Sequence, residues 1–304
     1  MILPLVYSKA VEDARDNDLP IVALESTIIT HGMPYPQNLK TAQEVEEVVR
    51  DAGAVPATIA LLGGQIHIGL EGDELERLAQ ARDVRKLSRA DMAVAVAQKA
   101  DGATTVAATM IAARLGGIEV FATGGIGGVH RGAGESFDIS ADLSELAQTP
   151  VSVIAAGPKA ILDLPKTLEV LETYGVPVIT FGQSELPAFW SRDSGLSSPL
   201  RVDTVEEMAK AHVMRAVMGI PGGQLINNPI PLEAEIPRDV IEPLVAQALS
   251  EAEAKGIEAK AVTPFLLQRI FELSEGASLV SNIALVKNNA SLAARLASAI
   301  KDIS

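Results

Sequence analysis

The chain has 304 residues, with 25 Lys and Arg against 39 Asp and Glu, so its formal net charge is −14. This acidity argues against a nucleic acid or an anionic membrane surface as a partner held by bulk charge. The chain has no Cys, which excludes disulfides, thiolate zinc sites, iron–sulfur clusters and cysteine nucleophiles. Hydrophobic residues make up 48% of the chain and aromatic residues only 3%. We therefore expect a core of Ala, Val, Ile and Leu in helices packed on a sheet.

The first residues give no targeting signal. Met1–Tyr7 is apolar but lacks a basic start, and acidic residues follow from Glu12 onward. No uncharged apolar run in the sequence reaches the roughly 18 residues that a membrane-spanning helix needs. We therefore expect a cytoplasmic protein without a membrane partner.

Short β-rich runs alternate with segments of helical periodicity up to about residue 230. The predicted strands are Ile21–Leu24, Thr58–Leu62, Glu119–Thr123, Val151–Ala155 and Val176–Phe181. The predicted helices are Leu39–Ala52, Arg89–Lys99, Lys159–Thr173 and Val205–Met218. This alternation predicts an α/β fold of three layers, α/β/α, with a mixed but largely parallel central sheet.

The C-terminal part of the chain has only helical periodicity. Helices are predicted over Pro237–Lys255, Pro264–Leu273 and Leu279–Ile300, and we expect them to form a helical cap. No segment has the composition of a linker, so residues 1–304 are predicted to form a single domain. The least regular stretch, Ser184–Pro199, is predicted to be a mobile loop or a lid.

Glu25 follows directly after the first predicted strand. Ligands of open α/β sheets bind beyond the carboxyl ends of the strands, so this position is a candidate site. A carboxyl group there is partly removed from water, which favours the protonated form that a general acid needs. A solvated loop carboxylate or a helix cap is the alternative for Glu25.

A glycine-rich segment follows the third predicted strand, with six glycines among the eleven residues 124–134. Such a segment lets the backbone approach a ligand closely and point N–H groups at an anion. It lacks the third glycine of the dinucleotide fingerprint and the Lys-Ser or Lys-Thr of a Walker loop, so neither site is predicted. His130 in this segment either polarises a carbonyl group or caps a turn.

Asp138 and Asp142 come just after the glycine-rich segment. Without Cys and with few His, any metal here is expected to be a hard cation with oxygen ligands. Such an ion needs only one or two carboxylates, with water completing the coordination shell. Helix N-caps are the alternative for both aspartates.

Two lysines stand where a ligand could be held. Lys159 follows the fourth predicted strand and Pro158, a residue that fits the first turn of a helix. The helix dipole and burial would then both favour the neutral, nucleophilic amine, whereas a surface lysine is the alternative. Lys86 lies in the basic cluster 85–89 and either binds a phosphate or is solvated at a helix start.

Several long motifs occur together in one order: ALESTIITHGMPYP from residue 23, KLSRAD from 86, ATTVAATM from 103, the glycine-rich stretch 121–143, VIAAGPKAILDLPKTLEVLETYGVPVITF from 153, LINNPIP from 225, and TPFLL with NIALVKNNASLAARLA after 262. In their order and spacing they resemble the pseudouridine-5′-phosphate glycosidase family, which includes the indigoidine-synthase-A-like proteins. The resemblance covers nearly the whole chain. It implies an enzyme, a C-glycosidase of the lyase class, that reversibly cleaves pseudouridine 5′-phosphate with water to uracil and ribose 5-phosphate.

The resemblance also implies roles for individual residues. By match of motif, Lys159 corresponds to a Schiff-base lysine, Glu25 to a proton donor and Asp138 to a ligand of Mn²⁺, with Mg²⁺ or another hard divalent cation as the alternative. Lys86 corresponds to the residue that binds the substrate phosphate. The other substrate-binding positions implied are Thr105, Val106, His130, Ser140, Ala141, Asp142 and Asn289. A homotrimer is implied as the assembly.

The chemistry of a carbon–carbon bond agrees with these roles. The base leaves through carbon, so protonation of a leaving oxygen or nitrogen is not available. If Glu25 assists opening of the ribose ring, C1′ becomes an electrophile that Lys159 captures as an iminium. A paired-carboxylate mechanism is not indicated, because only one well-placed acid is found. Another Schiff-base lyase of aldolase type and a non-catalytic sugar-phosphate sensor are the alternatives.

Overall fold

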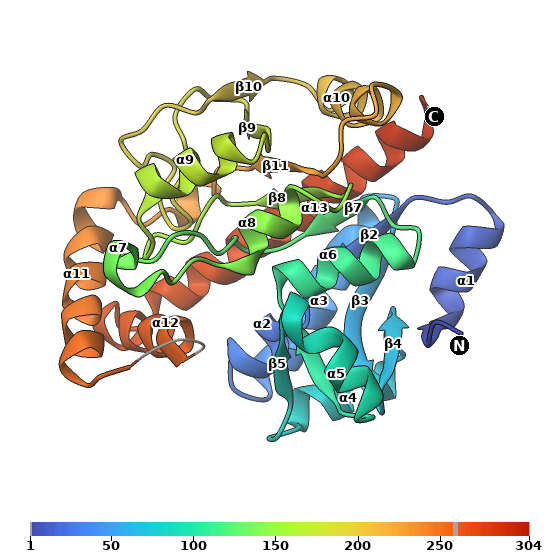
Figure 1. The fold of residues 1–304 in the computed structure, drawn as a ribbon, viewed down its shortest axis with the longest axis horizontal. Coiled ribbons are helices and arrows are strands. Elements are labelled where there is room, and N and C mark those ends of the chain that lie inside the picture. The colour runs from blue at the N-terminus through green and yellow to red at the C-terminus, as the bar shows by residue number, and fades with distance from the viewer. Residues whose placement is uncertain (1, 258–260, 304) are drawn as a thin grey trace.

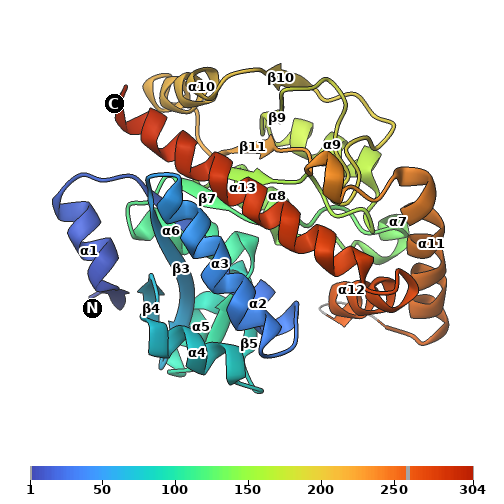
Figure 2. The same ribbon diagram turned by 180° about the vertical axis from the view of Figure 1, so that it is seen from behind.

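The computed structural model describes residues 2–257 and 261–303, and it shows a mixed sheet between two layers of helices (Figure 1, Figure 2). The main path through the sheet has the strand order β1-β4-β3-β2-β7-β8-β11-β9-β10, while β5 pairs with β6 and β6 with β3. All these pairs are parallel except β3 with β4 and β3 with β6. The strands are β1 (Leu5–Tyr7), β2 (Ile21–Leu24), β3 (Val55–Leu62), β4 (Gln65–Ile68), β5 (Arg85–Leu87), β6 (Gly102–Thr104), β7 (Val120–Ala122), β8 (Ser152–Ala155), β9 (Val178–Phe181), β10 (Leu200–Val202) and β11 (Gln224–Asn227).

The helices cover both faces of the sheet. Figure 2 shows α13 crossing one face beside α3 and α10, and α13 contacts β2, β7 and β8. On the opposite face α6 packs on β2, β3 and β7 and against α8. The helices are α1 (Lys9–Asp16), α2 (Thr27–His31), α3 (Gln37–Asp51), α4 (Gly72–Gln80), α5 (Met92–Ala97), α6 (Val106–Leu115), α7 (Ala133–Ser136), α8 (Ala141–Leu146), α9 (Leu164–Thr173), α10 (Val205–Val217), α11 (Arg238–Ala254), α12 (Val262–Leu273) and α13 (Ala277–Lys301). The predicted three-layer α/β/α fold is confirmed.

The C-terminal helices divide into two groups. Of the three helices predicted to form a cap, only α11 and α12 do so, packing against each other at one end of the sheet (Figure 1), whereas the prediction is wrong for the third, α13. In contrast, α13 is the central helix of one layer, and its Ala290, Ala293 and Ala294 are fully buried. Small side chains let this helix lie close to the sheet, which agrees with a core that has few aromatic residues.

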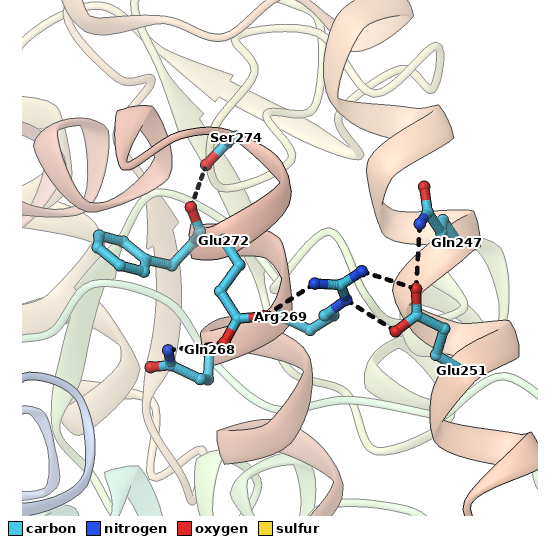
Figure 3. A network of polar contacts seen from close by, with 7 residues as sticks. Gln247, Glu251, Gln268, Arg269, Glu272 and Ser274 are labelled. Carbon is cyan, nitrogen blue, oxygen red and sulfur yellow. Dashed lines mark hydrogen bonds and ion pairs between the residues drawn. The ribbon is translucent and has the colours of Figure 1, made fainter.

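A network of charged side chains joins α11 to α12 (Figure 3). The Arg269 guanidinium donates to both carboxylate oxygens of Glu251, at 2.7 and 3.0 Å, and also to Glu272 at 2.8 Å. These hydrogen bonds lower the pKa of Glu251 and of Glu272. The bidentate pair adds geometric specificity to the contact between the two helices.

The long strand β3 brings two parts of the sheet together at one point. Its first half pairs with β2, whereas its second half pairs with β4 and antiparallel with β6. Because of that reversal, the carboxyl end of β6 meets the carboxyl end of β2 near the middle of β3. There the Ser26 hydroxyl accepts a hydrogen bond from the Thr104 N–H at 2.9 Å. Loops that follow both strands therefore face the same space.

The predicted helix Lys159–Thr173 is wrong at its start, because α9 begins at Leu164. The Asp163 side chain caps this helix by accepting from the Lys166 N–H at 3.2 Å, and Pro165 occupies its first turn. Residues before Asp163 instead pair with the glycine-rich segment through the bridges Ile126 to Pro158 and His130 to Leu162. Lys159 therefore lies in a loop, and the helix dipole does not act on it as predicted.

The stretch 184–199 is irregular as predicted, with no helix or strand assigned to it. It is nevertheless packed into the core, since Leu186 is fully buried and Trp190 is 1% exposed. The Trp190 indole donates to Oδ1 of Asn282 on α13 at 2.7 Å. These contacts indicate a fixed wall rather than a mobile lid. Within residues 2–257 and 261–303, no helix combines the length and apolarity that a bilayer crossing requires.

Candidate active site

A cavity of about 380 Å³ lies beyond the carboxyl ends of β2, β6 and β7. Every site residue predicted from the sequence except Asn289 is part of its wall: Glu25, Lys86, Thr105, Val106, His130, Asp138, Ser140, Ala141, Asp142 and Lys159. A second cavity, of about 360 Å³, lies on the other side of Leu162 and holds none of these residues. We take the first cavity as the candidate active site because it contains both the Glu25 carboxylate and the Lys159 amine.

Glu25 directly follows the carboxyl end of β2, and both of its carboxylate oxygens accept hydrogen bonds. Oε2 accepts from the hydroxyl of Thr27, and Oε1 accepts from the hydroxyl of Thr123 at the end of β7. The side chain is half-buried. Two hydroxyl donors hold the carboxylate in one orientation, in the wall of the cavity that Lys159 also lines.

Lys159 reaches the cavity from the loop between β8 and α9. Its Nζ donates to the backbone oxygen of Gly125 at 2.9 Å, and its backbone N–H donates to Ile126 at 3.2 Å. Both partners belong to the glycine-rich segment. That segment therefore positions the amine in place of the predicted helix terminus.

Two histidines in the wall share the electrostatic field of the lysines. Burial lowers the pKa of His31, and the charge of Lys86 lowers it further. Burial likewise lowers the pKa of His130, aided by Lys159 and Lys86 and opposed by the carboxylate of Asp138. The surroundings of both imidazoles therefore favour the neutral form.

Asp142 bridges two parts of the cavity wall, the start of α6 and the glycine-rich segment. It is only 6% exposed, and its carboxylate accepts from the N–H of Ala107 at 3.0 Å and of Gly127 at 2.8 Å. A Cβ on Gly127 would lie 2.3 Å from the hydroxyl oxygen of Ser140, so only glycine fits this close approach. Asp142 thus joins the start of α6 to the glycine-rich segment.

Other predicted residues line the cavity through the starts of helices. Thr105 is the N-cap of α6 and Val106 its first residue, while Ser140 is the N-cap of α8 and Ala141 its first residue. Backbone N–H groups at such positions favour an anionic ligand. The N-cap role offered as the alternative for Asp138 and Asp142 falls to neither of them, because Ser140 caps α8 and Asp142 lies within that helix.

Asn289 does not reach the cavity. It is fully buried, and its Nδ2 donates to the backbone oxygens of Thr123 at 2.8 Å and Gly124 at 3.4 Å. Asn282, on the same helix, lines the cavity instead. The sequence reasoning also missed the wall residues Thr27, His31, Phe189 and Leu267. Thr27 and His31 follow Glu25 closely, and this nearness was the one signal available.

Comparisons with known proteins give matches over nearly the whole chain. The family model described as indigoidine synthase A like protein matches residues 10–299. Two relatives named pseudouridine-5′-phosphate glycosidase are similar over nearly their whole length. The protein from Jannaschia sp. (strain CCS1) is 68% identical over 300 residues, covering 99% of this chain and 99% of the relative. The protein from Paracoccus denitrificans (strain Pd 1222) is 70% identical over 300 residues, covering 98% and 99%.

A solved structure has nearly the same fold. The prealnumycin C-glycosynthase AlnA, in complex with ribulose 5-phosphate, matches with a TM-score of 0.92 and 35% sequence identity. The match covers 100% of this chain and 99% of the other. A protein of this fold thus holds a five-carbon sugar phosphate.

Replacing Asp142 with Asn tests the role of its carboxylate as a support. One backbone N–H would then face the amide NH₂ instead of an oxygen. Because hydrogen bonds to a charged group contribute about 1.5–3 kcal/mol, we expect Asp142→Asn to lower the free energy of unfolding by about that amount. Urea unfolding in EDTA measures it. Asp138→Asn, the same change at a half-exposed carboxylate, should cost less than about 0.5 kcal/mol. Equal losses in the two variants would contradict the assignment.

Proposed function

The chain belongs to the family of indigoidine synthase A-like proteins and is an enzyme, and we propose that it reversibly cleaves pseudouridine 5′-phosphate with water to uracil and ribose 5-phosphate. The observation that carries the proposal is the presence of one carboxylate, Glu25, and one lysine amine, Lys159, in a single cavity. The names of the relatives support the same substrate. The sugar phosphate bound by the structural neighbour supports the phosphorylated pentose.

The bond to be broken joins C1′ of ribose to C5 of uracil. A carbon leaving group has no lone pair to protonate, so the reaction needs an electron source on the sugar side. Glu25 assists opening of the ribose ring, which makes C1′ electrophilic, and the amine of Lys159 adds to it. Proton delivery to C5 then accompanies scission of the C–C bond. The nitrogen lone pair forms an imine, which water hydrolyses to ribose 5-phosphate and the free amine.

Lys86 is the residue proposed to bind the 5′-phosphate. It lies on β5, and its charge acts on both His31 and His130 in the wall of the cavity. The first residues of α6 and α8 also lie in this wall, at the positive ends of the two helix dipoles, while the N–H groups of Ala107 and Asp142 already donate within the protein. A dianionic phosphate thus finds a cation and oriented dipoles in a protein that is otherwise acidic.

A hard divalent cation, Mn²⁺ or Mg²⁺, is proposed at Asp138. Within the described ranges, no group of three or more His, Asp or Glu is placed to hold a metal. The half-exposed carboxylate of Asp138 in the cavity wall fits an ion that keeps most of its water and takes one protein ligand. Such an ion would neutralise charge on a phosphorylated substrate. The homotrimer implied by the family resemblance stays a prediction.

Trapping with borohydride tests the role of Lys159. Incubation with ribose 5-phosphate and borohydride should add the mass of a reduced pentose phosphate to the peptide that contains Lys159, because the imine is reduced to a stable amine. Lys159→Arg should abolish both the adduct and turnover. Lys166→Ala is the matched control, since this exposed lysine pairs with Asp163 outside the cavity. An adduct on another lysine would contradict the assignment, and trapping without uracil release would indicate another Schiff-base lyase.

A comparison of nucleotide with nucleoside tests Lys86. A hydrogen bond to a charged group contributes roughly 1.5–3 kcal/mol, so Lys86→Ala should lose about tenfold to a hundredfold in kcat/KM on pseudouridine 5′-phosphate. On unphosphorylated pseudouridine the variant and wild type should be alike. Arg85→Ala, at the exposed neighbour on β5, should change neither. An equal loss on both substrates would show that Lys86 does not bind the phosphate.

Metal removal tests the proposal for Asp138. EDTA should abolish activity, and Mn²⁺ or Mg²⁺ should restore it. Electron paramagnetic resonance should detect protein-bound Mn²⁺ in the wild type and little in Asp138→Asn. Glu135→Gln, an exposed carboxylate on the neighbouring helix α7, should bind Mn²⁺ as the wild type does. Full activity of the metal-free protein would refute a catalytic ion.

A further inference from the structure

Glu25 accepts one of its two hydrogen bonds from Thr123, a residue outside the wall of the cavity of about 380 Å³, which is called the large cavity below. Thr27, one of its two hydroxyl donors, lies two residues away and lines the large cavity. The other donor, Thr123, comes from a different strand, lies 98 residues along the chain and is fully buried. Resting on the function proposed above, we propose that Thr123 is a positioning residue that sets the orientation of Glu25 for proton transfer.

The surroundings of Thr123 fix its hydroxyl in space. Its backbone N–H donates to Ile154 on β8 at 3.0 Å, and its backbone oxygen accepts from the Asn289 side chain at 2.8 Å. The residue borders a cavity of about 20 Å³ behind Glu25 and is absent from the wall of the large one. Glu25 thus faces the large cavity, whereas Thr123 lies outside its wall.

The segment that contains Thr123 also binds the amine of Lys159. Gly125, two residues after Thr123, accepts the hydrogen bond from the Nζ of Lys159 at 2.9 Å. A Cβ on Gly125 would lie 2.6 Å from the ring of Phe189 and 3.0 Å from the backbone oxygen of Gly157, so the segment is closely packed. The carboxylate of Glu25 and the amine of Lys159 are thus both hydrogen-bonded to the same short segment, residues 123–125. Asn289 fixes this segment to α13.

Without the Thr123 hydroxyl, the Glu25 carboxylate keeps only one of its two hydroxyl donors. Oε1 of Glu25 would lose its donor, and the side chain would be held by Thr27 alone. Misplacement of a reacting group by about 1 Å lowers a rate by about a hundredfold. Binding of the substrate depends on other wall residues, so the loss should fall on kcat and leave KM unchanged.

Thr123→Val tests the proposal, because valine has nearly the shape of threonine but no hydroxyl. With pseudouridine 5′-phosphate we expect kcat to fall about tenfold to a hundredfold, with KM changed less than about twofold. Thr123→Ser should restore most of kcat, because serine keeps the hydroxyl. Borohydride trapping of ribose 5-phosphate on Lys159 should stay at the wild-type yield, which shows an intact fold and amine. If Thr123→Val does not fold, Thr123→Ala gives the same comparison with a smaller side chain.

Thr58→Val is the matched control. Thr58 borders the same small cavity and donates to a buried carboxylate, that of Glu46, at 2.6 Å, but it does not contact Glu25. It should lose stability and keep the wild-type kcat. The proposal is overturned if Thr123→Val keeps the wild-type kcat, if Thr123→Ser does not restore it, or if Thr58→Val loses as much. If the wild-type protein releases no uracil, the proposed function fails instead.

Discussion

The glycine-rich segment after β7 is the part of the structure on which the candidate site depends. Its residues 123–127 bind the carboxylate of Glu25, the amine of Lys159 and the buried carboxylate of Asp142. Backbone atoms make two of these three contacts, so they do not depend on side-chain rotamers. The glycines are required because neighbouring atoms leave no room for a Cβ at Gly125 or Gly127. One side chain, that of Thr123, and the closely packed backbone at Gly125 together hold Glu25 and Lys159 in one cavity.

The strand order of the sheet brings Glu25, Thr123 and Lys159 to one edge. Parallel strands β2, β7 and β8 end at one edge, and their loops carry Glu25, Thr123 and Lys159. The reversed pairing of β6 on the second half of β3 brings Lys86 and Thr105 to this edge as well. The side of the cavity that carries Lys86 and the side that carries Glu25 and Lys159 thus come from two differently oriented parts of one sheet. The α11–α12 pair closes the far end, where Leu267 joins the wall.

Strong local patterns in the sequence predicted much of this arrangement. Buried parallel strands are near-continuous apolar runs, so β2, β8 and β9 were predicted within a few residues of their ends. The residues after β2 and β7, which were expected at a ligand site, line the large cavity. The start of α9 was predicted wrongly because Pro158 and Pro165 both fit a first turn, and the side-chain cap that decides between them is Asp163. Short strands such as β5 and β6 carry too few residues for a periodicity.

Tertiary packing determines which side chains line the cavity and which ones pair across the fold, and local sequence patterns do not predict either. Asn282 and Asn289 lie seven residues apart, close to two helical turns, and so share one stripe of α13. Only the extent of the cavity places Asn282 in its wall and buries Asn289 behind it. The hydrogen bond from Thr123 to Glu25 spans 98 residues and leaves no trace in either local sequence. Pairings of this kind depend on strand order, which the sequence pattern did not determine.

The release of uracil from pseudouridine 5′-phosphate tests the central claim most directly. The wild-type protein with Mn²⁺ should convert the nucleotide to free uracil and ribose 5-phosphate in equal amounts, and in the reverse direction it should join them. Lys159→Arg and Glu25→Gln should each release none at the same protein concentration. Uracil release by either variant at the wild-type rate, or none by the wild type with Mn²⁺ present, would contradict the assignment of the acid and the amine to this cavity.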